Sequence, residues 1–147
     1  NVEIYIKRSQ IKSAMDDKKG AFQDLEKALT LEPNNVEIYI KRSQIKSAMG
    51  DKKGALQDLE KVLIIEPKNI DIYIKRSQIK SAMGDKKGAL QDLTKVIRLA
   101  PQNPTAYIER CLIKIHLNDK NGCCSDFKKA RQLGWNVPER ELEAFCK

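Results

Sequence analysis

The feature that most constrains this chain is an internal repeat of 34 residues. The opening segment, residues 1–5, returns with few changes at residues 35–39 and 69–73, and a looser copy begins at Asn103. The first two copies differ at 6 of 34 positions, so 28 positions are identical. Self-similarity at a fixed period of this length indicates a repeat architecture, in which each unit packs mainly on its neighbours.

Each copy is predicted to fold as two helices. In the first copy, Ala21, Leu25 and Ala28 have the spacing of one apolar helical stripe. In the second copy, Gly50 stands where the first helix ends in a left-handed residue, and Pro67 ends the second helix. A single helix pair cannot bury its own stripe, so the units must stack on one another. The sequence therefore predicts an all-α fold.

The pattern within each copy resembles the tetratricopeptide repeat family. That family's motif has an aromatic residue, a small residue, Ala, an apolar residue, a second Ala and Pro at fixed offsets. The first copy carries them as Tyr5, Ser9, Ala21, Leu25, Ala28 and Pro33. The resemblance implies a right-handed superhelical solenoid of four helix-turn-helix units in one domain over residues 1–147. The expected units are about 1–34, 35–68, 69–102 and 103–136, followed by a capping helix at about 137–147.

The resemblance also implies that the first helix of each unit lines a concave groove. Three consecutive apolar residues, Ile4, Tyr5 and Ile6, cannot all share one buried stripe, so one of them is expected to face away from the core. This ladder of polar and apolar side chains suits an extended peptide or a partner helix, so we expect a protein-protein interaction scaffold. The predicted groove residues are Ile6, Lys7, Gln10, Ile40, Lys41, Gln44, Ile74, Lys75, Gln78, Ile108, Leu112 and His116.

Two details of the predicted groove bear on its ligand. Some family members bind a C-terminal carboxylate through Lys and Asn on the groove face. Here Ile and Gln stand at the corresponding positions of the first three units, so such a clamp is not expected. In the fourth unit, Leu112 and Ile115 form either an apolar end of the groove or a surface that the capping helix covers, and both interpretations stay open.

Each unit also carries an Arg that is followed 16 residues later by an Asp. An Arg that is partly buried between two helices needs a fixed carboxylate, and a bidentate pair provides one. These residues are therefore interpreted as structural ion pairs within each unit rather than as ligand-binding groups. The pairs are Arg8 with Asp24, Arg42 with Asp58, Arg76 with Asp92, and Arg110 with Asp126.

The chain has 28 basic and 20 acidic residues, a formal net charge of +8. The excess leaves an alternative function open, a basic surface that docks on nucleic acid or on an anionic membrane. Nucleic acid is disfavoured, because aromatic residues make up only 5% of the chain and stacking needs them. A third alternative is a self-stacking assembly element, which associates through an uncapped face of the first helix.

All four cysteines lie at or after residue 111. Cys111 and Cys123 take facing small positions of the fourth unit and are expected to pack as small apolar residues. Cys124 points toward the capping helix, so a disulfide with Cys146 is possible in an oxidising compartment. That bond would favour a secreted or periplasmic location, and its absence a cytoplasmic one. A zinc site from these cysteines and His116 lacks a recognised spacing, so no metal is expected.

The sequence contains no motif that is typical of an enzyme. The chain has one His, and it lacks a Gly-rich phosphate loop, a nucleophile elbow and a paired-carboxylate motif. No catalytic residue and no cofactor are therefore expected. No apolar run approaches the roughly 20 residues that a membrane-spanning helix requires, so no transmembrane segment is expected either. Protein or peptide partners remain the expectation.

Overall fold

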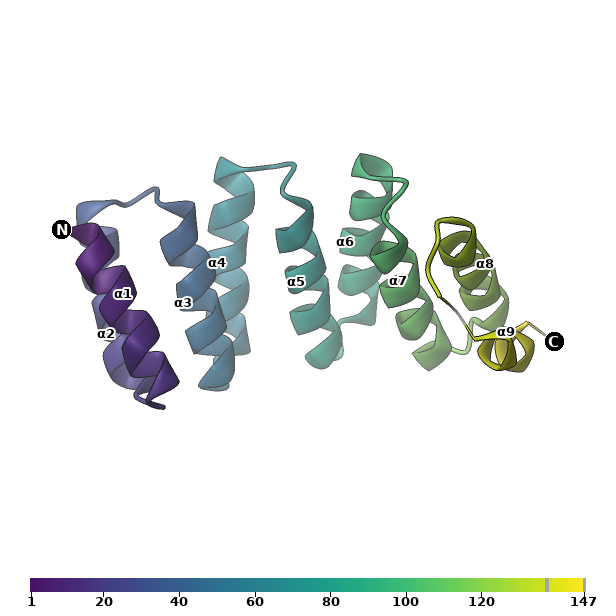
Figure 1. Ribbon diagram of the computed structural model, residues 1–147, viewed down its shortest axis with the longest axis horizontal. Helices are drawn as coiled ribbons and strands as arrows, with labels where there is room; N and C mark the ends of the chain where they lie inside the picture. Colours follow the sequence, from purple (N-terminus) through teal and green to yellow (C-terminus); the bar gives the residue numbers. More distant parts are fainter. Residues whose placement is uncertain (137, 147) are drawn as a thin grey trace. The chain divides into compact units, whose positions relative to one another are not determined.

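The computed structural model describes residues 1–136 and 138–146, and these residues form helices and turns without a strand (Figure 1). Helical hairpins follow one another along the chain, and this confirms the predicted all-α fold class. None of the helices among the described residues is both long and apolar enough to span a membrane. The helices are α1 (Val2–Ala14), α2 (Lys18–Leu31), α3 (Val36–Ala48), α4 (Lys52–Ile65), α5 (Ile70–Ala82), α6 (Lys86–Leu99), α7 (Pro104–His116), α8 (Lys120–Gln132) and α9 (Glu139–Phe145).

The chain divides into two compact units, residues 1–69 and 70–147, which are here called the N-terminal and C-terminal units. In the N-terminal unit, α1 packs on α2, α3 packs on α4, and α2 contacts α3. In the C-terminal unit, α5 packs on α6, α7 packs on α8, and α6 contacts α7. The short helix α9 contacts α8. Each unit thus contains two stacked hairpins, and a single array over the whole chain stays a prediction.

Side-chain caps start the second helix of every hairpin. An Asp at the N-cap accepts a hydrogen bond of 2.8 Å from the backbone N–H of a Gly three residues later. This bond satisfies one of the amides that a helix start leaves without a partner. The side chain of a larger residue would collide with the capping carboxylate, which explains why Gly recurs there. The pairs are Asp17 with Gly20, Asp51 with Gly54, Asp85 with Gly88, and Asp119 with Gly122.

The turn inside each hairpin requires a left-handed residue. Gly50 and Gly84 adopt φ angles of 86° and 87°, while Asp16 and Asn118 adopt 64° and 58° at the equivalent positions. Gly takes this conformation without strain, whereas Asp at position 16 costs up to about 1 kcal/mol. The turn therefore reverses the chain so that the two helices of each hairpin pack on each other.

Buried apolar residues fill the space within each unit. The core of the N-terminal unit is formed by both hairpins together, because α3 contributes Ile38 and Ile45 to the cluster around Leu25. In the C-terminal unit, one cluster forms around Ala89, Leu93 and Ile113, where α7 packs on α6. A second cluster contains Cys111, Cys123 and Phe127. The first helices are thus fixed by packing on their inner sides, and their other sides remain available.

Candidate functional site

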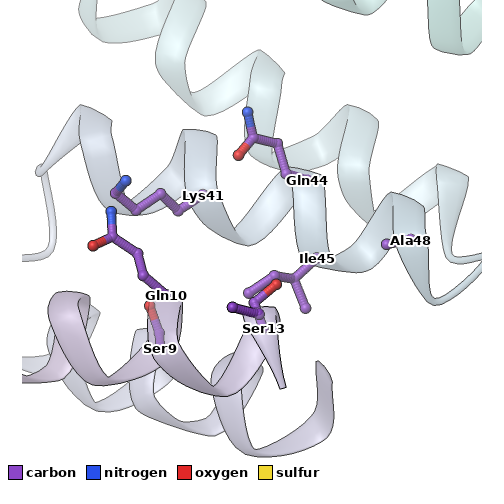
Figure 2. Close-up of a pocket in the computed structure, with 8 residues that line it drawn as sticks. Ser9, Gln10, Ser13, Lys41, Gln44, Ile45 and Ala48 are labelled. Atoms are coloured by element: carbon purple, nitrogen blue, oxygen red, sulfur yellow. The ribbon is translucent and has the colours of Figure 1, made fainter. Parts of the chain in front are cut away.

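A cavity of about 540 Å³ lies between the first helices of the N-terminal unit (Figure 2). We call it the N-terminal subsite. One wall comes from α1 and the other from α3, and the amide of Gln10 and the ammonium group of Lys41 reach toward each other from opposite walls. The lining residues are Ser9, Gln10, Ser13 and Ala14 of α1 with Lys41, Gln44, Ile45 and Ala48 of α3.

Polar groups in the N-terminal subsite are available to a ligand. Gln10 and Gln44 are exposed, and their side-chain amides form no hydrogen bond within the part of the chain that the structure describes. The Lys41 ammonium lies 3.4 Å from a carboxylate oxygen of Glu37, one turn earlier on the same helix. Ile45 is buried and gives the cavity an apolar floor. The subsite therefore offers amide donors and acceptors beside one ammonium group.

The C-terminal unit has a smaller cavity of about 280 Å³ in the equivalent place, which we call the C-terminal subsite. The side-chain amide of Gln78 on α5 donates a hydrogen bond of 3.0 Å to the Glu109 carboxylate on α7. At the other end of the cavity, the Lys86 ammonium donates to the Ser81 carbonyl and hydroxyl oxygens at 3.0 and 2.9 Å. The remaining lining residues are Ser77, Ala82, Leu112, Ile113 and His116.

The two subsites share one wall and differ in the other. The α1 and α5 walls have the same four residue types, Ser, Gln, Ser and Ala, in the same order. On the facing wall, the two subsites have only the floor residue in common, which is Ile45 in one subsite and Ile113 in the other. Its three other positions change from Lys41, Gln44 and Ala48 on α3 to Glu109, Leu112 and His116 on α7.

The predicted groove residues fall into two groups. Lys41, Gln10, Gln44, Gln78, Leu112 and His116 line one of the two subsites. Lys7 and Lys75 lie on first helices but line neither of them.

The isoleucines of the predicted groove line neither subsite. Ile6 is buried in the core of the N-terminal unit, and Ile40 is half-buried. Ile74 packs on the cluster around Leu93, and Ile108 packs on the cluster around Phe127. Three of the four thus pack with a hydrophobic cluster, and a ligand-binding role for these isoleucines stays a prediction.

Leu112 and Ile115, which the sequence placed either at an apolar end of the groove or under the capping helix, have different surroundings. Leu112 keeps 48% of its surface exposed and lines the C-terminal subsite. Ile115 packs on the cluster of Cys111, Cys123 and Phe127, which Cys146 also contacts. Of these two residues, Leu112 is the one that lines the C-terminal subsite.

The four Arg–Asp pairs form within their hairpins. Each Arg donates two hydrogen bonds to its Asp, one to each carboxylate oxygen. In the first hairpin these bonds measure 2.7 and 2.5 Å, and the Asp24 carboxylate is buried. The same geometry recurs for Arg42 with Asp58, Arg76 with Asp92, and Arg110 with Asp126. A pair that is closed in this way holds two helices together.

A lysine completes each of these pairs, and the sequence analysis missed it. Lys12 lies one turn after Arg8 on α1, and its ammonium is 3.0 Å from the second carboxylate oxygen of Asp24. The i, i+4 spacing of Arg and Lys is the signal that could have revealed it, since it places both cations on one helix face. The other members of this row are Lys46, Lys80 and Lys114, at 2.8 to 3.1 Å from Asp58, Asp92 and Asp126.

Electrostatics reinforce the networks. The hydrogen bond from Arg8 lowers the pKa of Asp24 to about 2, burial opposes this shift, and the Lys12 ammonium adds to it. The hydrogen bond to Asp126 raises the pKa of Arg110 above its usual value. Each guanidinium also lies over a tyrosine ring of its own helix, as Arg8 does over Tyr5 at 5.3 Å. The networks are therefore part of the fold in every copy.

Two disulfides hold the last hairpin and the short helix α9. Cys111 is bonded to Cys123, which joins α7 to α8, and Cys124 is bonded to Cys146, the pair that the sequence suggested. The prediction that Cys111 and Cys123 pack as free thiols is wrong, because their facing positions bring the Cα atoms to 4.1 Å. Among the described residues, no group of three or more His, Cys, Asp and Glu side chains is arranged to hold a metal ion.

The fold and these subsites define a class of protein, the helical-hairpin repeat proteins. A family model for the tetratricopeptide repeat matches residues 2–35, 36–69 and 70–103, three consecutive repeats. The chain therefore belongs to the tetratricopeptide repeat family, as its sequence pattern predicted. These repeats support a role as a protein-interaction scaffold.

Solved structures give the same fold. A tetratricopeptide repeat protein from Parabacteroides merdae is similar with a TM-score of 0.88 and 24% identity, over 98% of this chain and 58% of that one. A crystal structure of MamA is similar with a TM-score of 0.82 and 22% identity, over 91% of this chain and 78% of that one. A structure of MamA from Desulfovibrio magneticus is similar with a TM-score of 0.80 and 17% identity, over 91% of this chain and 76% of that one. No curated protein matches the chain significantly.

Proposed function

We propose that this protein binds a peptide or a partner helix along its first helices, at the two subsites. The observation that carries the proposal is where the fourth repeat departs from the others. It keeps the ion network of Arg110, Lys114 and Asp126, and it keeps the floor residue Ile113. Its other residues on the α7 wall of the cavity are replaced. The ion network and the floor residue are thus retained, whereas the residues of this wall that would touch a ligand are replaced.

The chemistry of the N-terminal subsite supports a peptide ligand. Carboxamides such as those of Gln10 and Gln44 can donate to backbone carbonyls and accept from backbone amides of a bound chain. Without intramolecular partners, they lose no protein hydrogen bond when a ligand arrives. The buried floor at Ile45 offers an apolar contact beside them. Polar groups that fix an extended chain, beside pockets that take its side chains, are the usual means of peptide recognition.

A basic docking surface has less support. Four lysines that contribute to the positive charge, the row from Lys12 to Lys114, contact buried aspartates. Lys18 likewise pairs with Asp16, and Lys86 is bound to Ser81. Lysines held in this way are poorly placed to exchange partners with phosphate groups. A peptide-binding groove is therefore the better supported candidate.

Selection from a random peptide library tests the proposal. Peptides selected on the whole chain are measured against a groove variant, Gln10→Arg with Leu112→Arg, in which both changed residues are exposed and line the subsites. The matched control is Gln23→Arg with Gln91→Arg, at exposed positions of second helices. We expect the groove variant to lose binding at least tenfold while the control retains it. The reverse order of losses, or equal losses, would contradict the proposal.

A second candidate, self-association through α1, rests on a separate observation. The sequences of α1 and α3 are identical over all thirteen residues, yet Ile4 is 60% exposed while its equivalent Ile38 is fully buried in the core cluster to which α2 contributes. The α1 face thus has the apolar residues of a helix–helix interface without a cover. Light scattering over a range of concentrations should detect association that Ile4→Glu abolishes, and a constant mass would exclude it.

A further inference from the structure

We propose that the C-terminal subsite selects a cationic side chain, Lys or Arg, of the bound peptide. Glu109 would be its charge partner and Leu112 the surface for its aliphatic stem. This inference rests on the proposed groove function and adds the class of side chain that one subsite takes. It follows from the lining residues of the two subsites and from the contacts that each lining residue already makes.

The charge of the subsite is reversed at one position. Glu109 on the α7 wall takes the repeat position that Lys41 has on the α3 wall. The residues at this position in the other two repeats, Lys7 and Lys75, are lysines like Lys41. Glu109 forms no ion pair within the described residues, although the rest of α7 retains its Arg and Lys partners. A half-buried carboxylate that forms no ion pair is stabilised by a ligand that supplies a cation.

The geometry leaves room for that cation. The Gln78 amide donates to one carboxylate oxygen of Glu109, which fixes the carboxylate across the cavity. The second oxygen has no hydrogen-bond partner among the described residues, so a ligand ammonium or guanidinium can bond there. Orientation by a neutral amide does not remove the negative charge, so Gln78 positions the carboxylate without competing for its charge partner.

The apolar part of the subsite lies one turn along α7. Leu112 follows Glu109 by three residues, which places both side chains on one face of the helix, and nearly half of Leu112 is exposed. The buried Ile113 lines the cavity beside it. Long basic side chains place their methylene stems on apolar surface and their charged ends at a polar group. The sequence of a carboxylate followed by an exposed Leu fits such a side chain.

Two other basic groups face the cavity and set the direction of the ligand. The Lys86 ammonium is held at the Ser81 end by two hydrogen bonds, and His116 lies in the last turn of α7. Both basic groups lie toward the end of the cavity that is opposite Glu109, with Leu112 in between. A cationic group is therefore directed to the Glu109 end, where the negative charge is. In the N-terminal subsite the same position holds Lys41, which repels a cation.

Small-molecule titrations followed by NMR test this inference on the whole, isotope-labelled chain. The probes are N-acetyl-lysine methylamide and its uncharged analogue N-acetyl-norleucine methylamide, used at millimolar concentration. We expect the lysine compound to shift the side-chain amide of Gln78 and the methyl groups of Leu112. The norleucine compound should bind about fivefold more weakly, which is the ratio expected for one partly exposed ion pair.

Two variants make the test decisive. Glu109→Gln keeps the hydrogen bond from Gln78 but removes the charge, so it should lose the preference for lysine. The triple variant Lys41→Glu, Gln44→Leu and Ala48→His transfers the α7 wall to the N-terminal subsite and should create a second lysine response at Gln10. Equal binding of both probes, an unchanged preference in Glu109→Gln, or equal lysine binding at both natural subsites would overturn the inference.

The outcome separates this inference from the proposed function. If library peptides depend on Gln10 and Leu112 but show no enrichment of Lys or Arg and no loss in Glu109→Gln, the groove binds peptide and the cationic selectivity is wrong. If library peptides lose affinity only for the second-helix control variant, the groove function itself is wrong. A lysine-specific response at Glu109 together with enrichment of basic residues in the peptides supports both.

Discussion

The two subsites of this protein are built on the same scaffold and present different chemistry. Their α1 and α5 walls are the same residue for residue, and both have a buried isoleucine as the floor. The α3 wall offers Lys41 and Gln44, whereas the α7 wall offers Glu109 and Leu112. The difference teaches that in this chain the positions which fix the helices are separable from the positions which face a ligand, so each set can be tested without disturbing the other.

The largest expected effect comes from breaking the part of the scaffold that both units share. Asp58→Ala leaves Arg42 and Lys46 without their buried carboxylate, and the loss should be about 3–5 kcal/mol of unfolding free energy. Arg42→Leu should cost less, because Lys46 still pairs with Asp58. Urea unfolding of both variants, and of Asp126→Ala in the C-terminal unit, measures this. Equal losses for Asp58→Ala and Arg42→Leu would show that the carboxylate has no special role.

The apolar floor of the subsites should give the next largest effect. Ile45→Ala removes a side chain that is 6% exposed, and we expect a loss of about 2–4 kcal/mol in stability. The same substitution at Ile11, which has identical neighbours in sequence but is 61% exposed, should cost less than about 0.5 kcal/mol. Thermal unfolding compares the two. A similar loss at both positions would mean that the burial difference between α1 and α3 is absent in solution.

Acid should weaken the shared ion networks. Because the folded-state pKa of Asp24 is lowered from 3.8 to about 2, the network contributes its full stability above about pH 4 and loses it as pH falls toward 2. The free energy of unfolding should therefore fall over this range. Asp24→Asn should show a shallower fall, since it no longer takes up that proton. An identical pH dependence in wild type and variant would exclude Asp24 as a source of acid sensitivity.

The smallest effect on stability is expected where the two subsites differ. Gln44→Leu and Leu112→Gln exchange the residues of one subsite for those of the other at exposed positions, so each should change the unfolding free energy by less than about 0.5 kcal/mol. Their effect should appear in binding instead, with altered affinity for library-selected peptides. A large loss of stability in either variant would show that these side chains serve the fold rather than a ligand.

Most of the fold could be predicted from the sequence, because the repeat, the turn glycines and the helix-ending prolines are local signals. The pairing of Arg8 with Asp24 also followed, since an Arg at an inter-helix position needs a carboxylate. The third member of that network, Lys12, was missed, although its spacing from Arg8 was visible. Sequence also identified Cys111 and Cys123 as facing positions but not the bond between them.

The residues that line the two cavities could be predicted only in part, and the reason is physical. Ile4, Tyr5 and Ile6 are consecutive, and local periodicity does not say which of them faces away from its own hairpin. The answer depends on the neighbouring hairpin, because Ile38 is buried in the N-terminal unit while Ile4, in an identical helix, is exposed. Burial of this kind is a property of the stacked units and is not encoded in thirteen residues. The polar residues Gln10, Gln44 and Gln78 line the cavities, and their role in binding stays a prediction.

The most direct test of the central claim is to map a library-selected peptide on the whole chain by NMR chemical-shift changes. The account predicts that the largest changes fall on the side-chain amides of Gln10, Gln44 and Gln78 and on the methyl groups of Leu112, all on first helices. Amides of the second helices α2, α4 and α6 should change little. Changes concentrated on those second helices, with the first helices unaffected, would contradict the groove as the binding surface.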